Sequence, residues 1–366
     1  MVEMTATDET VEEQQQAEAA PLREWRRLIG ALLLLFSPLL LLGVLLESLA
    51  WRIGETMPAA MVSAWQDGGA DRIWRGGDGH SYLVYKLARV ADLKPAVIAL
   101  GPGRANAFRA RPFAPYGFYN AGQIAWTFDQ YRRFLELVTK DGYAPRALVF
   151  DLDYWMFASG FDHYWADRFD EHPETHVANL LRVAGRLAEA PADLLRRLPD
   201  TARERGLFAL LTGDGFNPDG SRPVCPATQD PQRLADDSTG VGVPPVVLAD
   251  HIAAEQVAEF DQFVAFAKSK HIALIGVQLP FYAKILDGLK DNPDAGIWRE
   301  FESAAWQQQH LAASGVAFFD FADMAEYRDK PGYFSDSLDP DARVVTDITR
   351  RMLADPSVRA VLPDAK

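Results

Sequence analysis

Two short segments carry the residue types and spacing that could perform chemistry together. The first is Gly101-Pro102-Gly103-Arg104, where an apolar run ends in glycines and an arginine. The second is Asp336-Ser337-Leu338-Asp339-Pro340, a turn with two carboxylates that precedes the last expected helix. Open α/β sheets bind ligands outside the carboxyl ends of their strands. We therefore expect both segments at the carboxyl edge of one parallel sheet.

Five short apolar runs must position these segments. They cover residues 96–100, 116–120, 147–152, 272–279 and 316–319, and helical patterns cover 127–140, 174–198, 251–268, 298–313 and 343–353. Buried parallel strands have this continuous apolar character, and their alternation with helices predicts a sheet covered on both faces. The predicted fold class is α/β, a three-layer sandwich with a five-stranded parallel flavodoxin-like sheet, preceded by one amino-terminal transmembrane helix.

The amino-terminal region predicts a membrane anchor. Residues 1–27 are acidic and glutamine-rich, which is typical of a disordered cytoplasmic tail. The run Leu28 to Leu46 is uncharged and close to the roughly 20 residues that cross a bilayer as a helix. Because Arg23, Arg26 and Arg27 precede it, the main domain should lie outside the cytoplasm. A signal peptide cleaved after Ser48-Leu49-Ala50 is the alternative, and a buried core helix is the least favoured one.

The composition divides the chain and excludes several functions. We expect a transmembrane helix over 28–50, a juxtamembrane segment over 51–94, and a domain over 95–366 with an insertion at about 199–250. A net charge of -14 without a basic cluster does not fit a nucleic-acid binder. The single cysteine, Cys225, can form no internal disulfide and has no metal-ligand spacing. We expect no metal and no cofactor, because Pro173 interrupts the helical spacing of His172 and His176 near His163.

The motifs resemble the SGNH (GDSL-type) hydrolase superfamily. The closer resemblance is to its membrane-anchored branch, which accompanies membrane-bound O-acyltransferases in modifying extracytoplasmic polysaccharides. Residues 101–104 stand where that branch has Gly-x-Ser-Arg, Asn120-Ala121-Gly122 matches Asn-x-Gly, and residues 336–340 match Asp-x-x-His-Pro. The resemblance covers about residues 95–353. Weaker similarities are Phe108-Arg109, Gly215-Phe216, Asp219-Gly220-Ser221 and Leu279-Pro280.

The resemblance implies site roles and two losses. Gly122 is similar to the family's oxyanion donor, and Asp153 or Tyr154 stands near its oxyanion asparagine. Gly103 falls at the nucleophilic serine and Asp339 at the histidine base. A serine nucleophile needs a hydroxyl and a base within hydrogen-bond reach, and glycine has no hydroxyl. An aspartate with an ordinary pKa of about 3.9 is a weak base at neutral pH.

We therefore expect a catalytically degenerate protein of the inner membrane, with its main domain in the periplasm. It would act as a binding or scaffold partner in O-acylation of envelope polysaccharide, with a membrane-bound O-acyltransferase and a polysaccharide as partners. One alternative is an acyltransferase or esterase on a glycan, in which Asp336 and Asp339 activate a water or a substrate hydroxyl. Another is a structural protein whose sheet edge is filled by Phe108, Phe113 or Trp155.

The remaining charged candidates lie near the first segment. Arg104 either holds an anionic ligand or forms a structural ion pair with Asp151 or Asp153, and the ion pair is favoured. Asn120 is a candidate ligand-binding residue with Gly122. Asp151 and Asp153 also suggest a metal or two-carboxylate site. We expect the strand to hold these two carboxylates apart, which disfavours such a site.

Overall fold

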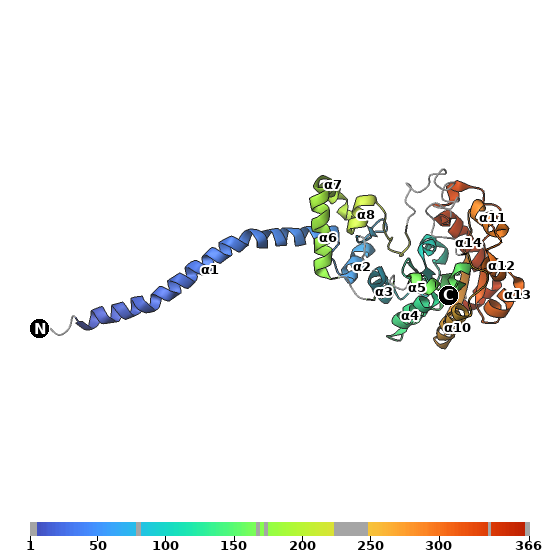
Figure 1. The fold of residues 1–366 in the computed structure, drawn as a ribbon, viewed down its shortest axis with the longest axis horizontal. Coiled ribbons are helices and arrows are strands. Elements are labelled where there is room, and N and C mark those ends of the chain that lie inside the picture. The colour runs from blue at the N-terminus through green and yellow to red at the C-terminus, as the bar shows by residue number, and fades with distance from the viewer. Residues whose placement is uncertain are drawn as a thin grey trace. The chain divides into compact units, whose positions relative to one another are not determined.

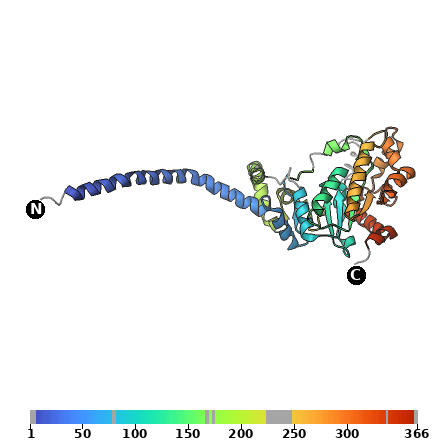
Figure 2. The same cartoon turned by 90° about the horizontal axis from the view of Figure 1, so that it is seen from below.

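The protein consists of two compact units, one that ends at Arg52 and one that begins at Ile53. The computed structural model describes residues 6–77, 82–165, 169–171, 175–222, 248–335 and 338–362 (Figures 1 and 2). The predicted sites at His172, Cys225 and Asp336, and residues 223–247 of the insertion, lie outside the described residues.

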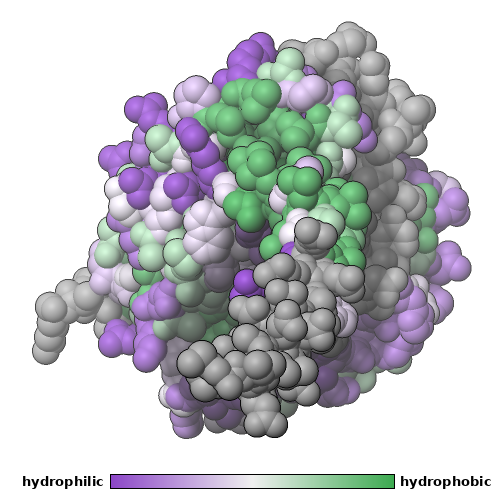
Figure 3. All heavy atoms as spheres, turned by 90° about the vertical axis from the view of Figure 1, so that its left-hand side faces the viewer, coloured by the Kyte–Doolittle hydropathy of each residue, from purple (hydrophilic) through white to green (hydrophobic). Residues whose placement is uncertain are grey.

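The first unit is the long helix α1 (Ala6–Ile53). Its apolar part, Leu28–Ile53, has 26 residues, and its most apolar window is 0% buried. This exposure excludes a buried core helix and fits a membrane anchor or a signal sequence. In the view of Figure 3, apolar residues gather in a green band. The helix begins already at Ala6, in the segment expected to be disordered, because its many Glu, Gln and Ala residues favour helix.

The main sheet has five parallel strands in the order β3-β2-β4-β6-β7. They are β2 (Val97–Gly101), β3 (Phe118–Gly122), β4 (Ala147–Asp151), β6 (Ala273–Gln278) and β7 (Ala317–Asp320). Every residue of β2, β3 and β4 is buried, which explains their continuous apolar sequences. The strand order is that of flavodoxin-like sheets and confirms the predicted α/β fold.

Alternate strand residues serve the cores on the two faces of this sheet. Ile98 and Leu100 of β2 join the core that contains residues of α4 (Phe128–Thr139) and α10 (Ala254–Ser269). Val97 and Ala99 join the core that contains residues of α14 (Ala342–Ala354). The other helices of the sheet region are α3 (Tyr82–Leu93), α5 (Phe161–Trp165), α11 (Ala283–Asp291), α12 (Gly296–Phe301), α13 (Ala304–Trp306) and α15 (Pro356–Val361). The helix expected over 298–313 is thus interrupted, and Gln307–Ala312 forms a π-helix.

The expected juxtamembrane segment and the described part of the insertion fold together. Strand β1 (Ile73–Trp74) pairs in parallel with β5 (Glu204–Arg205). Helices α2 (Ala59–Asp67), α6 (His176–Glu189), α7 (Pro191–Arg197) and α8 (Leu207–Thr212) belong to the same region. We call residues 53–77 and 175–222 the proximal subdomain. Its small core includes Trp74 and Phe216, so the described insertion is not simply a surface loop.

The insertion also covers the edge strand β3. The Asn120 N–H donates to the Asp219 carbonyl at 2.8 Å. The buried Lys86 ammonium donates to the carbonyl oxygens of Asn120 (2.9 Å) and Gly220 (2.5 Å). Burial lowers the pKa of Lys86 well below its ordinary value. These bonds satisfy backbone groups that an open edge strand would leave to another chain.

Candidate functional site

Gly103 and Asp339 lie side by side at the carboxyl edge of the sheet. Gly103 begins the short helix η1 (Gly103–Ala107), directly after β2. A β-carbon on Gly103 would lie 3.7 Å from Asp339 Oδ2, and among the described residues beyond its chain neighbours nothing else lies within 4 Å. The Asp339 carboxylate therefore faces the position where a side chain on residue 103 would begin. The structure brings together the two segments that the sequence singled out.

A tight turn before α14 holds Asp339 in place. The Ser335 N–H donates to the Asp339 carbonyl at 2.9 Å, and Phe334 forms an antiparallel bridge with Pro340. Asp341 caps α14, where its side chain accepts hydrogen bonds from backbone N–H groups. A capped helix start fixes the preceding turn. The expected pairing of Asp336 with Asp339 stays a prediction, because Asp336 is not among the described residues.

Arg104 is a buried structural residue of this edge. Its guanidinium pairs with Asp153 Oδ1 at 2.5 Å and donates to the carbonyls of Leu279 (2.8 Å) and Pro280 (3.2 Å). The guanidinium carbon also lies 5.3 Å from the ring centre of Trp155. These contacts join the segments that follow β2, β4 and β6, and they confirm the ion-pair interpretation with Asp153.

The carboxyls of Asp151 and Asp153 form a coupled pair, and our expectation that the strand holds them apart is wrong. Residues two apart in an extended chain point to the same side, and the two buried carboxyls lie close enough for Asp153 to raise the pKa of Asp151. Neither oxygen of Asp151, nor Asp153 Oδ2, has a donor from another described residue. Burial, and then Asp153, raise the pKa of Asp151 well above its ordinary value. Burial also raises the pKa of Asp153, but Arg104 opposes this, so the pKa of Asp151 is raised more than that of Asp153.

Asn120 and Gly122 shape the loop after β2. Asn120 Nδ2 donates to the carbonyls of Ala105 (2.7 Å) and Phe108 (2.9 Å). Its Oδ1 accepts from the Gly122 N–H at 2.6 Å. A β-carbon on Gly122 would lie 3.0 Å from the Asn106 nitrogen, so this position accepts a side chain only with a shift. An oxyanion role for Gly122 stays a prediction, and it requires Asn120 to release this N–H.

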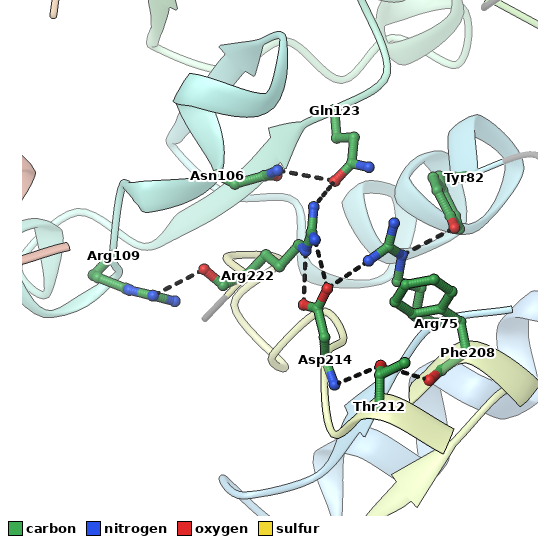
Figure 4. A network of polar contacts seen from close by, with 9 residues as sticks. All are labelled: Arg75, Tyr82, Asn106, Arg109, Gln123, Phe208, Thr212, Asp214 and Arg222. Atoms are coloured by element: carbon green, nitrogen blue, oxygen red, sulfur yellow. Dashed lines mark hydrogen bonds and ion pairs between the residues drawn. The ribbon is translucent and has the colours of Figure 1, made fainter. Parts of the chain in front are cut away.

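Sequence reasoning missed a polar network beside the edge (Figure 4). Gln123 Oε1 accepts from Asn106 Nδ2 at 2.9 Å and from Arg222 Nη1 at 3.1 Å. Gln123 has φ +70°, a left-handed conformation that is rare outside glycine and concentrates at functional sites. Burial lowers the pKa of Arg222, but Asp214 and, more weakly, Asp339 raise it overall. The network is therefore electrically linked to Asp339.

The same network ties the sheet edge to the proximal subdomain. Asp214 accepts from Arg222 at 2.7 Å and pairs with Arg75 at 2.6 Å, while Arg75 also donates to the Tyr82 hydroxyl at 3.1 Å. Arg109 donates to the Arg222 carbonyl at 2.9 Å (Figure 4). The sequence contained one signal of this network, the weak motif similarities at Phe108-Arg109 and at residues 215–221. The structure brings these two segments together.

No group of three or more His, Cys, Asp and Glu side chains among the described residues could hold a metal ion. Neither a protein-family model nor a curated protein sequence matches this chain. The five-stranded parallel sheet with its edge segments is compatible with SGNH-like folds.

Proposed function

We propose that this chain is a membrane-anchored, extracytoplasmic SGNH-like protein without ordinary ester-hydrolase activity. It binds an envelope polysaccharide and acts as a scaffold for a membrane-bound O-acyltransferase. The observation that carries this proposal is the pairing of Gly103 with Asp339: a carboxylate faces a position that has no side chain.

The chemistry supports binding over hydrolysis. Ordinary ester hydrolysis in this superfamily uses a serine hydroxyl whose proton a histidine removes. Glycine and aspartate stand at these two positions. A site that lacks one triad member keeps only roughly 10³–10⁴-fold acceleration over water from binding and oxyanion stabilisation. The turn after β2 places Gly103 beside Asp339, and a sugar hydroxyl that enters at the β-carbon position of Gly103 can donate to the Asp339 carboxylate.

The exposed apolar helix supports the location. Helix α1 carries 26 residues, from Leu28 to Ile53, that are apolar enough to cross a membrane. The arginines before it favour a cytoplasmic amino terminus. We propose an uncleaved single-pass anchor in the inner membrane, with the domain from Ile53 onward in the periplasm.

An esterase assay on the full chain in detergent tests the loss of catalysis. We expect no turnover of p-nitrophenyl acetate above the rate of buffer with detergent. Turnover that disappears in Asp339→Ala would overturn the proposal, because it would show a working site built on this carboxylate.

Binding is tested by calorimetric titration with O-acetylated polysaccharide and its de-O-acetylated form. Gly103→Leu should abolish binding, since its side chain fills the space beside Asp339. Gly288→Leu in α11 is the matched control, because its β-carbon also meets nothing within 4 Å. Equal affinity of both variants would reject the edge as the binding site.

A second candidate function is acyl transfer without an enzyme nucleophile. The observation that favours it is that Asp339 Oδ2 faces the β-carbon position of Gly103, where it can accept the proton of a substrate hydroxyl. That hydroxyl would attack the acyl carbonyl directly and expel the donor alcohol. Acetylation of the glycan by p-nitrophenyl acetate, detected by mass spectrometry and absent in Asp339→Asn, would establish this function in place of the scaffold.

A further inference from the structure

Helix α6 presents an uncharged apolar face to the outside of the globular unit. Val177 and Leu181 are 62% and 66% exposed. Gly185 and Ala188, which follow at helical spacing, are also exposed. Steps of four, four and three residues place these positions on one side of a helix. An ordinary surface helix would have polar side chains on this side.

The inward side of α6 carries the polar contacts. Asn179 is buried, and its Oδ1 accepts from Arg182 at 2.9 Å. Arg182 also pairs with the buried Glu55 at 3.0 Å. The orientation of α6 is therefore set by specific bonds, and its apolar face is held outward. Leu195 of the following helix α7 is also an exposed apolar residue, at 52%.

The ion pair of Glu55 with Arg182 holds α6 close to Ile53, where the apolar span ends. The span ends at Ile53, and two further residues reach at most roughly 7 Å. The Glu55 carboxylate accepts from the N–H groups of Gly77 (2.9 Å) and Leu207 (2.7 Å) as well as from Arg182. The Gly206 N–H donates to the Ile53 carbonyl at 2.5 Å. This end of the proximal subdomain therefore cannot move away from the end of the span.

We propose that the outward face of α6, with Leu195 of α7, docks on the lipid bilayer that holds α1. Interfacial helices bury an apolar face about 5–10 Å deep at the headgroup boundary and carry basic residues on their flanks. Arg186 of α6 and Arg196 of α7 lie near Glu189 and Asp193, and Arg196 is 77% exposed. Tethering turns weak surface binding into an intramolecular event.

This inference rests on the anchor in the proposed function, and the test separates the two. The full chain with Cys225→Ser, which removes its single cysteine, is reconstituted into phosphatidylcholine–phosphatidylglycerol vesicles. Leu181→Cys carries a nitrobenzoxadiazole fluorophore, and a doxyl-labelled lipid serves as quencher. Val361→Cys is the control, since Val361 is also an exposed apolar residue, at 41%. We expect a blue shift and loss of most emission at residue 181, and neither change at residue 361.

The other outcomes overturn the proposal. Unquenched emission at residue 181, in protein that resists alkaline carbonate extraction, would show that the anchor holds while α6 stays away from lipid. Disulfide cross-linking of unlabelled Leu181→Cys without lipid quenching would assign the face to a second copy of this chain. A blue shift without quenching or cross-linking would place the face against another part of this chain. Release by carbonate would overturn the anchor itself.

Discussion

The sheet edge and the proximal subdomain both bury carboxylates beside arginines, but they satisfy them differently. In the proximal subdomain, Glu55 accepts from two backbone N–H groups and from Arg182, so both oxygens are used. Asp214 likewise receives Arg75 and Arg222 on its two oxygens. At the sheet edge, both oxygens of Asp151 lack a donor from any described residue outside the Asp151–Asp153 pair.

This difference distinguishes carboxylates that only hold the fold together from carboxyl groups that can still bond to a ligand. Buried polar atoms are almost always satisfied, so each exception needs a physical explanation. In the proximal subdomain, the carboxylates hold distant segments together and have no capacity left. At the edge, the pKa of Asp151 is raised, and the Asp339 carboxylate faces Gly103, which has no side chain. The edge therefore keeps polar groups that can bind a ligand beside Gly103.

We expect the largest effect in the proximal subdomain, where the buried carboxylates are fully hydrogen-bonded. Glu55→Ala removes the acceptor of two buried N–H groups and the ion-pair partner of Arg182, and it should lower the free energy of unfolding by about 3–5 kcal/mol. Denaturant unfolding of the reconstituted chain measures this. The control is Glu189→Ala in α6, whose exposed carboxylate lies 3.8 Å from Arg186 and should contribute about 0–1 kcal/mol. Similar losses in both variants would contradict the structural role of Glu55.

The second prediction breaks the ion pair of the edge. Asp153→Asn leaves the buried Arg104 without its carboxylate, and the cost should be about 3 kcal/mol. The same unfolding measurement applies. A loss below that of the Glu189 control would mean that Asp151 replaces Asp153 as the partner of Arg104.

The third prediction sharpens the contrast between the two edge carboxyls. Because the folded-state pKa of Asp151 is raised, its proton stabilises the fold at low pH, and this contribution is lost as the pH rises above the ordinary value of about 3.9. Asp151→Asn keeps a neutral donor toward Asp153, so its melting temperature relative to the wild type should increase from pH 5 to pH 8. A difference that stays constant over this range would show that Asp151 is already ionised in the fold at pH 5.

The smallest effect is expected at the glycine itself. Gly103→Ser should change the free energy of unfolding by about 0.5 kcal/mol or less, because its β-carbon makes only an ordinary contact with Asp339. Combined with Asp339→His, it restores the residue types of the superfamily motifs. Gain of p-nitrophenyl acetate turnover in the double variant, but not in Asp339→His alone, would show that the edge retains the rest of a catalytic geometry.

Local sequence determined the parts of the fold that have a period or a composition of their own. The five apolar runs, the uncharged run from Leu28 and the two motif segments are readable because each is a property of neighbouring residues. Parallel strands share one edge, so the meeting of residues 101–104 with Asp339 also followed from the order of strands and helices. The ion pair of Arg104 was one of two interpretations until the contacts with Asp153 decided it.

Only the tertiary structure decided the proximal subdomain and the network at the edge. Strands β1 and β5 have two residues each, too few for any sequence period, and their pairing joins segments far apart in the chain. The side chains of Gln123, Arg222 and Asp214 acquire meaning only through one another, because an isolated polar residue gives no local sign of its partner. The outward apolar face of α6 was equally hidden, since helical periodicity identifies a face but not what lies against it.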